Sequence, residues 1–418
     1  MKLKRQFPRY KDVAPLLKFK KPELNPTRRR LNSAHTLWDI RKIAKRRTPT
    51  GPFNYVDGSA EDEVTIQKTR EYFRDIEFQP GILRDVSTAD TRTMVMGKQS
   101  ALPFGFAPTG FTRMMHSAGE RAVVRAAERT GIPYALSTMG TTSLEDVAAE
   151  APLARKWFQL YLWRDRDRSR ELLENAKRAG YDTLILTVDV PVAGNRVRDL
   201  RNGMVIPPEL TLKTVLDASY RPEWWFNFLT TEPLKFAFAA DENAGVVADV
   251  VANLYDPSAT FEDLAWMREA WGGPMVIKGI QTLDDAKRSV DFGADGLIVS
   301  NHGGRQLDRA PIPLRLLPEV VDAVGEQTEV MIDTGIMNGA DIVASIALGA
   351  KFAWIGRAYL YGLMAAGEEG VVKTVEILES EIVRTMKLLG VNKIADLNPD
   401  HVRLLEQQGL RQAARLVS

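Results

Sequence analysis

The sequence predicts an α/β fold of the (β/α)8 TIM-barrel class, with an N-terminal helical extension and a long lid excursion after the fourth strand. Eight short apolar runs occur from residue 102 onward, and most are followed by a stretch with helical periodicity. The runs do not alternate with polar residues, which is typical of strands buried on both faces. Eight units in β-then-α order favour a closed barrel over an open sheet.

The predicted strands are rich in Val, Ile, Leu and aromatic residues, as buried strands are. They span Leu102–Ala107, Tyr134–Ser137, Trp157–Leu162, Thr183–Asp189, Met275–Lys278, Gly296–Ser300, Glu329–Asp333 and Phe352–Ile355. The helical stretches between them span Glu120–Thr130, Ser143–Ala149, Arg168–Ala179, Leu283–Phe292, Pro313–Val324 and Gly339–Leu348. Several helices end at a residue type that helix C-termini favour, namely Gly131, Gly180, Gly293 and Gly349.

Three segments lie outside this repeat. About 85 residues separate Asp189 from Met275, where roughly 20 to 40 would suffice for one unit, so we expect an inserted lid over 204–260. Residues 36–75 look helical and should pack before the barrel, and 368–390 predict a long helix after it. The expected division is a basic arm, a barrel domain and a C-terminal tail, over residues 1–35, 36–390 and 391–418.

The charge of the chain is unevenly distributed. The formal net charge is only +2, yet residues 1–47 hold 16 Lys and Arg against three acidic residues, which leaves 40 against 51 in the remainder. A basic arm can contact nucleic acid, anionic lipid or an acidic surface of its own protein. A solvated or self-docked N-terminus explains the same charge run equally well.

The composition excludes several kinds of chemistry. There is no cysteine, which removes disulfides, thiolate nucleophiles and iron–sulfur ligation by this chain. The first residues lack the apolar region of a secretory signal, and no run of about 18 apolar residues exists to span a bilayer. We expect a cytoplasmic protein, soluble or peripheral on the inner face of the cell membrane, without a metal site.

Polar groups follow nearly every predicted strand, at the C-terminal face where barrels of this class hold their active sites. A hydrophobic core needs none of them. In chain order they are Pro108-Thr109-Gly110, Ser137-Thr138, Gln159 with Tyr161, Thr187 with Asp189, Lys278, Ser300-Asn301-His302, Asp333 and Gly356-Arg357. A lysine at a buried strand end is costly without a nearby anion, so Lys278 is hard to explain as packing.

Two of these strand ends are rich in glycine and precede helices, over Asp333–Met337 and Ile355–Arg357. Glycine lets the backbone approach a ligand, helix N-termini favour anions, and Arg357 can bind phosphate through two nitrogens. They follow strands seven and eight, the usual phosphate position of the fold. Tight packing explains such glycines about as often. Because GxGxxG and GxxxxGK[ST] motifs are absent, we expect a mononucleotide cofactor.

The stretch SNHGGRQLD, residues 300–308, contains one of only four histidines. His302 could be a histidine of the core, but Gly303 and Gly304 leave room for a substrate. Arg305 adds a fixed charge suited to a carboxylate, and an imidazole can accept a proton near neutral pH. The stretch therefore favours acid–base chemistry on a small acid.

Several stretches resemble the FMN-dependent L-2-hydroxy-acid oxidases and dehydrogenases. The resemblance extends from about Thr36 to Gly390, and KIAKRRTP, FAPTGFTR and GRAYLYGLMA look closest to the bacterial quinone-linked L-lactate dehydrogenases. The motifs are SNHGGRQLD, FQLYLWRDR (158–166), LTVDVPVAGNRVRDLRNG (186–203), VIKGI (276–280) and DTGIMNGADIVASIALGA (333–350).

The resemblance implies FMN as the cofactor and a role for each matching residue. It makes His302 the catalytic base, Asp189 its orienting partner, and Lys278 the neighbour of the flavin N1/O2 edge. Substrate binding would involve Arg305, Arg196, Tyr55 and Tyr161. The ring and ribityl chain would contact Pro108, Thr109, Gly110, Ser137, Gln159, Thr187 and Ser300, and the ribityl and phosphate end Asp333, Thr334, Gly335, Ile336, Met337, Gly356 and Arg357.

Packing could explain the two tyrosines, and a helix cap could explain Asp189. Three positions also depart from the family pattern. Its DGGxR becomes Asp333–Met337, which loses an arginine near the phosphate and leaves Arg357 and backbone amides to hold that charge. Gly110 replaces an alanine common in the oxidases, and Met139 stands where glycolate oxidase has tryptophan, so we expect a differently shaped pocket.

The expected reaction is oxidation of L-lactate to pyruvate, with electrons passed to quinone or another carrier. Residues 1–100 contain only His35, so they lack the histidine pair of a b-type haem domain. Alternatives are an oxygen-dependent oxidase, a family member acting on another 2-hydroxy acid or a modified peptide, and a noncatalytic flavin- or nucleic-acid-binding protein. The resemblance implies a homo-oligomer, specifically a tetramer, and it implies no nucleic-acid partner.

The predicted lid contains an aromatic stretch, RPEWWFNFLTTEPLKFAF, residues 221–238. Aromatic residues with few charges can lie in a lipid interface, where electrons could pass to quinone. Packing against the barrel explains them equally well. The aromatic residues are Trp224, Trp225, Phe226, Phe228, Phe236 and Phe238.

Overall fold

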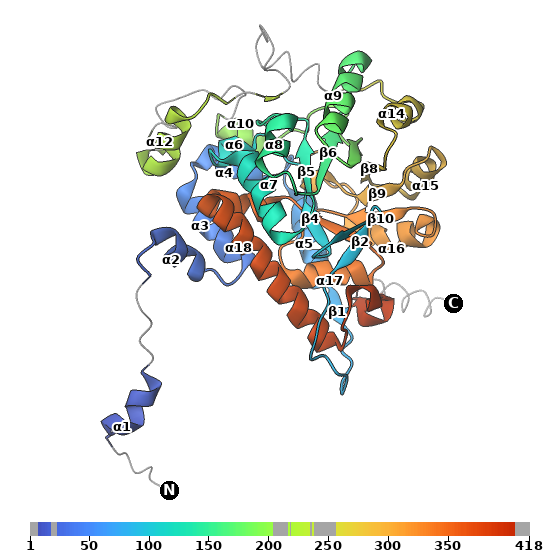
Figure 1. Cartoon of the computed structure of the whole chain (residues 1–418). Helices are drawn as coiled ribbons and strands as arrows, with labels where there is room; N and C mark the ends of the chain where they lie inside the picture. The colour runs from blue at the N-terminus through green and yellow to red at the C-terminus, as the bar shows by residue number, and fades with distance from the viewer. Residues whose placement is uncertain are drawn as a thin grey trace.

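A closed barrel of eight parallel strands forms the centre of the molecule (Figure 1). The computed structural model describes residues 7–17, 23–203, 216–217, 219–234, 236–237 and 256–405. The strand order is β10-β11-β4-β5-β6-β7-β8-β9, so strands adjacent in the chain are adjacent in the barrel. This confirms the predicted fold class. The strands are β4 Phe104–Phe106, β5 Tyr134–Ser137, β6 Lys156–Leu160, β7 Thr183–Thr187, β8 Met275–Ile280, β9 Gly296–Val299, β10 Glu329–Ile332 and β11 Phe352–Ile355.

The first barrel strand is shorter than the predicted Leu102–Ala107, because Pro103 and Pro108 flank it and proline donates no ladder hydrogen bond. Strand β8 is longer than predicted and continues past an irregularity between Lys278 and Ile280. All eight apolar runs nevertheless form barrel strands, so the periodicity argument holds for the barrel.

Helices surround the barrel on its outer face. They are α7 Gly119–Thr130, α8 Leu144–Glu150, α9 Arg166–Arg178, α14 Asp263–Trp271, α15 Leu283–Asp291, α16 Pro313–Val324, α17 Gly339–Ala347 and α18 Arg357–Leu389. Ser143, Asp165, Thr282 and Asn338 cap four of them by accepting backbone N–H groups. Helix α18 is broken at Ala366 and Gly367, so its second part matches the long helix predicted from residue 368.

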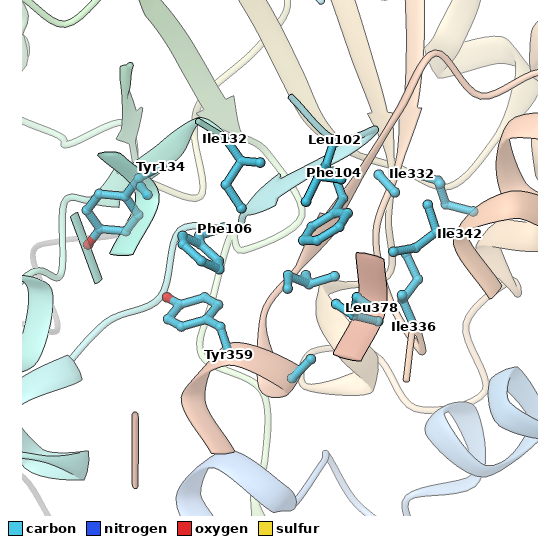
Figure 2. Close-up of a cluster of buried hydrophobic side chains, with 14 of the residues drawn as sticks. Leu102, Phe104, Phe106, Ile132, Tyr134, Ile332, Ile336, Ile342, Tyr359 and Leu378 are labelled. Atoms are coloured by element: carbon cyan, nitrogen blue, oxygen red, sulfur yellow. The ribbon is translucent and has the colours of Figure 1, made fainter. Parts of the chain in front are cut away.

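The hydrophobic core has two layers. Inside the barrel, Trp157 and Trp354 pack with ring centroids 4.7 Å apart, and Val95 of the β2–β3 hairpin joins them. The hairpin strands are Thr93–Val95 and Lys98–Ser100. A second layer lies between strands and helices; Figure 2 labels Leu102, Phe104, Phe106, Ile132, Tyr134, Ile332, Ile336, Ile342, Tyr359 and Leu378 from it. Burial of these side chains holds the strand ends in fixed positions.

The predicted helical extension consists of α3 Leu37–Arg47, α4 Thr50–Asp57 and α5 Val64–Arg74. Thr36 and Asp39 form a capping box at the start of α3, which packs against α18. Strand β1 Ile76–Phe78 pairs antiparallel with β12 Val402–Leu404, so part of the predicted tail is ordered against the extension. Figure 1 shows α1 projecting away from the body. The arm contains α1 Tyr10–Val13, η1 Ala14–Leu16 and α2 Pro26–Asn32, and η4 Ile394–Asp396 and η5 Pro399–His401 precede β12.

Much of the predicted lid, including Phe238, lies outside the described residues. Three further described helices lie between β4 and β8 in the chain. They are α6 Thr112–Met115, α10 Val197–Arg201 and α12 Pro222–Thr230. Phe236 is buried, with its ring 4.3 Å from that of Phe111, so packing explains this member of the aromatic stretch. No helix in the described part of the chain is long and apolar enough to cross a membrane.

Candidate active site

A cavity of about 740 Å³ lies at the C-terminal ends of the strands, where the helical extension meets the barrel. Most of the predicted site residues line it: Tyr55, Pro108, Thr109, Gly110, Tyr161, Arg196, Lys278, His302, Arg305, Asp333, Thr334, Gly335, Ile336, Met337, Gly356 and Arg357. The remaining predicted residues are not among its lining. Ser137, Gln159, Thr187 and Ser300 are buried, and the side chain of Asp189 has no exposed surface.

His302 and Asp189 form a direct pair. His302 begins η3 (His302–Gly304) with a left-handed φ of 56°, and its Nδ1 lies 2.9 Å from Oδ1 of Asp189. Its Nε2 lies 3.5 Å from the hydroxyl of Tyr161. Gly279 makes this approach possible, because a Cβ there would lie 2.7 Å from the Cβ of Asp189. Glycine at position 279 therefore leaves the space that the Asp189 side chain occupies beside the imidazole.

The electrostatics of this pair favour a neutral imidazole. Burial lowers the pKa of His302 below its ordinary value, although Asp189 acts to raise it. Burial alone would raise the pKa of Asp189, but His302 and Lys278 together lower it. The ionised carboxylate accepts a hydrogen bond from Nδ1–H, which leaves Nε2 as a proton acceptor at neutral pH.

Two arginines bring positive charge to the same cavity. The guanidinium carbon of Arg305 lies 4.8 Å from the ring centroid of Tyr55, and that of Arg196 lies 5.6 Å from it. Arg305 also donates to the carbonyl oxygen of Tyr55 and, at 3.3 Å, to that of Gly58. Burial, with the nearby charge of Arg196, lowers the pKa of Arg305 to about 10. A bound carboxylate would relieve this repulsion.

Lys278 is buried at the end of β8 beside two anions. Its Nζ lies 3.1 Å from Oδ2 of Asp333 and donates to Oγ of Ser300 at 3.1 Å. Burial alone would lower the pKa of Lys278, but Asp333 and Asp189 raise it above its ordinary value. The lysine is therefore charged. Asp333, predicted at the ribityl end, is its counter-ion.

Two buried polar atoms at neighbouring strand ends lack a partner within the described residues. Oε1 of Gln159 accepts from Oγ of Ser137 at 2.9 Å, but Nε2 of Gln159 has no hydrogen bond, and neither has Oγ1 of Thr187. Buried polar groups without a hydrogen-bond partner are rare in folded proteins. Together with Lys278, they fit the carbonyl and ring-nitrogen groups of a flavin, so these residues suit FMN.

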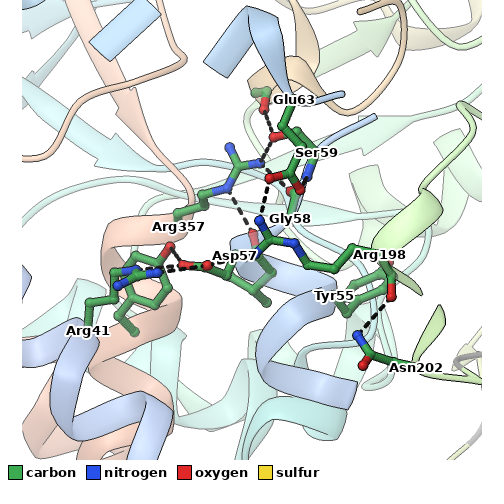
Figure 3. A network of polar contacts seen from close by, with 12 residues as sticks. Arg41, Tyr55, Asp57, Gly58, Ser59, Glu63, Arg198, Asn202 and Arg357 are labelled. Atoms are coloured by element: carbon green, nitrogen blue, oxygen red, sulfur yellow. Dashed lines mark hydrogen bonds and ion pairs between the residues drawn. The ribbon is translucent and has the colours of Figure 1, made fainter. Parts of the chain in front are cut away.

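Arg357, predicted at the phosphate, points toward the helical extension. Its Nε donates to the carbonyl of Val56 at 2.8 Å, and Nη2 donates to Gly58 at 2.7 Å and to the hydroxyl of Ser59 at 3.1 Å (Figure 3). Burial lowers the pKa of Arg357. Its hydrogen bonds in the described structure go to neutral groups, so the positive charge remains suited to an anionic ligand.

The sequence did not identify a second polar network beside this arginine (Figure 3). Asp57 at the end of α4 binds Arg41 at 2.6 and 2.8 Å, Arg198 at 3.0 Å and the hydroxyl of Tyr361 at 2.9 Å. Arg198 also pairs with Glu63. These residues come from the extension, α10 and α18, and Asp57 and Arg198 each lie two positions from a predicted residue, Tyr55 and Arg196.

The two pocket departures noted in the sequence lie against each other. A Cβ on Gly110 would lie 2.7 Å from the Cβ of Met139 and 3.3 Å from its carbonyl oxygen. Glycine at one position is therefore matched to methionine at the other, and an alanine at position 110 would force Met139 to move.

The comparisons with known proteins agree with this geometry. A family model described as FMN-dependent dehydrogenase matches residues 44–404. A Mycobacterium tuberculosis protein named "Putative L-lactate dehydrogenase" is 57% identical over 409 residues, covering 98% of this chain and 99% of the relative. An L-lactate dehydrogenase of Caulobacter vibrioides is 41% identical over 366 residues, covering 86% and 95%. The structure of monotopic membrane protein (S)-mandelate dehydrogenase matches with TM-score 0.86 and 36% identity, covering 89% of this chain and 100% of that chain.

The protonation of His302 can be measured directly. In an NMR titration of the four histidines, with His302 assigned from the spectrum of His302→Gln, we expect a pKa below 6.5 for His302. Asp189→Asn removes a contribution that raises this pKa, so the midpoint should move to still lower pH. A midpoint above 6.5, or one that rises in Asp189→Asn, would contradict the assignment.

Proposed function

Because the chain belongs to the FMN-dependent dehydrogenase family, we propose that it oxidises L-lactate to pyruvate and passes the two electrons to quinone or another carrier. One observation supports this most strongly: the Asp189-backed imidazole of His302 lines the same cavity as the guanidinium groups of Arg305 and Arg196. A proton acceptor and a carboxylate site are what oxidation of a small 2-hydroxy acid requires.

In this proposal Arg305 and Arg196 bind the substrate carboxylate. The two cations repel each other in a buried site, so an anion between them is stabilised by both. Tyr55 limits the movement of both guanidinium groups through its ring and its carbonyl oxygen. The carboxylate is thereby oriented, which places the rest of the acid near His302.

His302 accepts the substrate proton at Nε2, and Asp189 stabilises the imidazolium that results. Positioned general bases of this kind contribute roughly 10²- to 10⁴-fold to a rate. Oxidation removes two electrons and two protons from lactate: His302 takes one proton, and the two electrons with the other proton would go to FMN when it is bound. When bound, FMN supplies the two-electron chemistry, and Lys278, Gln159 and Thr187 are the residues that would hold its ring.

Different observations bear on the choice of substrate and on the choice of electron acceptor. The relatives named L-lactate dehydrogenase favour lactate, whereas the match to a mandelate dehydrogenase makes a larger 2-hydroxy acid the second candidate. Met139 and Gly110 line the cavity and would shape the space for the substrate side chain. An oxygen-dependent oxidase would be distinguished by stoichiometric hydrogen peroxide. We also propose a homotetramer on the resemblance, to be measured by sedimentation.

We further propose that α12 contacts the membrane surface. Phe226 and Leu229 are 67% and 68% exposed, whereas Trp224 donates to the carbonyl of Met114 and is held against the body. Arg47 of α3 pairs with Glu223, which fixes the start of the helix. One solved relative is described as a monotopic membrane protein. Exposed apolar side chains on an anchored helix suit an interfacial position.

The proposed reaction is tested with anaerobic mixing of the yellow holoprotein and L-lactate. We expect rapid bleaching of the flavin absorbance, and a rate at least about 100-fold lower in His302→Gln with the flavin still bound. A panel of L-2-hydroxy acids, including L-mandelate, identifies the preferred side chain. Absence of bleaching with every acid, or full activity of His302→Gln, would reject the proposal.

The membrane contact is tested with Phe226→Ser/Leu229→Ser. We expect this variant to lose sedimentation with anionic vesicles while its reduction of a soluble dye by lactate is retained. The matched control is Leu153→Ser, which removes an exposed leucine from another part of the barrel. Equal vesicle binding by the wild type and the double variant would mean that α12 is not the contact.

A further inference from the structure

An arginine that neither the motif nor the repeat pattern identifies lies against the phosphate-end loop. Arg70 of α5 donates through Nη1 to the carbonyl oxygen of Gly335, and the same nitrogen lies 2.6 Å from Oδ2 of Asp341. The helix packs closely on this loop, since a Cβ on Gly335 would lie 2.6 Å from Cγ2 of Thr69. Arg70 therefore reaches the end of β10 from outside the barrel repeat.

The guanidinium of Arg70 is only partly used by these contacts. Both hydrogen bonds in the described structure leave from Nη1, and the buried Nε has no partner there. An arginine has five N–H donors in a planar fork. The side chain is 16% exposed and lines the cavity, with its guanidinium carbon 5.4 Å from the ring centroid of Phe73. Gly335 and Asp341 hold Nη1, and the other N–H groups of the guanidinium are available to a ligand.

The positive charges at this end of the cavity exceed the carboxylates that are free to pair with them. Asp57 is already shared by Arg41 and Arg198, and Asp341 is occupied by Arg70 and by the backbone N–H of Met337 at 2.8 Å. Arg357 makes its described hydrogen bonds with carbonyl and hydroxyl groups. A phosphate with up to two negative charges would balance this surplus.

We propose that Arg70 is a ligand of the FMN phosphate, so that the helical extension supplies a guanidinium where the loop itself presents the uncharged Met337. Asp341 tethers Nη1 and so holds the rest of the guanidinium in place. Arg357 contributes the second guanidinium from the start of α18. The proposal depends on FMN as the cofactor and is independent of which 2-hydroxy acid is oxidised.

Flavin-free protein titrated with FMN and with riboflavin tests this assignment, because riboflavin lacks the phosphate. Binding is followed by quenching of flavin fluorescence. We expect Arg70→Met to weaken FMN binding at least about tenfold, which corresponds to 1.4 kcal/mol, with riboflavin affinity within about twofold of wild type. Lys68→Met is the matched control, because it removes an exposed cation from the same helix and should change neither affinity.

A second comparison tests whether the position of the charge matters. Adding Met337→Arg to Arg70→Met returns a guanidinium to the same loop and should restore most of the FMN affinity. Removing Arg70 alone leaves Asp341 buried without its cation, which can destabilise the fold. Arg70→Met/Asp341→Asn removes both charges, and against Asp341→Asn alone it should show the same selective loss for FMN.

Two results would overturn the assignment. Unchanged FMN affinity in Arg70→Met would show that the guanidinium does not bind the phosphate. Equal loss of FMN and riboflavin affinity, in Arg70→Met and in the charge-neutral double variant, would show that Arg70 only supports the loop. Because neither readout needs turnover, both are distinguishable from failure of the proposed reaction.

Discussion

The mouth of the barrel depends on a buried cation, Lys278, between two buried carboxylates. It lies 3.1 Å from Asp333, and its charge also lowers the pKa of Asp189. A charge buried alone would be costly, whereas Lys278 and Asp189 each favour the ionised form of the other. Ionised Asp189 in turn fixes the protonated nitrogen of His302. The basicity of the imidazole therefore depends on Asp189 after β7 and on Lys278 of β8, and not only on its own loop after β9.

The helical extension completes this site instead of merely covering it. The carbonyl oxygens of Tyr55 and Gly58 accept from Arg305, and Val56 and Gly58 accept from Arg357. At the start of α5, Asp308 accepts the backbone N–H and the hydroxyl of Thr65, which ties the loop after Arg305 to the extension. Arg305 and Arg357, on two sides of the cavity, are thus held by the same short segment.

The sequence predicts the barrel and its strand ends because burial on both faces and the β-then-α repeat leave a strong local pattern. It also predicts that His302, Arg305 and Lys278 face one cavity, since parallel strands end at one face. Periodicity does not say which outside helix closes that face. Asp57 and Arg70 were therefore missed, although both lie in a segment predicted to be helical.

The aromatic stretch over residues 221–238 shows a second limit of prediction from sequence. Its aromatic residues look alike in sequence, but Phe236 is buried against Phe111 while Phe226 is exposed. Composition cannot separate the two, because an aromatic side chain suits a core and an interface equally. The pairing of β12 with β1 was missed as well, because these three-residue strands carry too little pattern to show a partner.

In the proposed reaction, Arg305 and Arg196 hold one small acid while His302 accepts its proton. The most direct test is a crystal structure of the holoprotein His302→Gln after anaerobic soaking with L-lactate. We expect the carboxylate to lie within hydrogen-bond distance of Arg305 and Arg196, with the hydroxyl-bearing carbon facing the side chain at position 302. A lactate bound elsewhere, or one whose carboxylate contacts neither arginine, would contradict it.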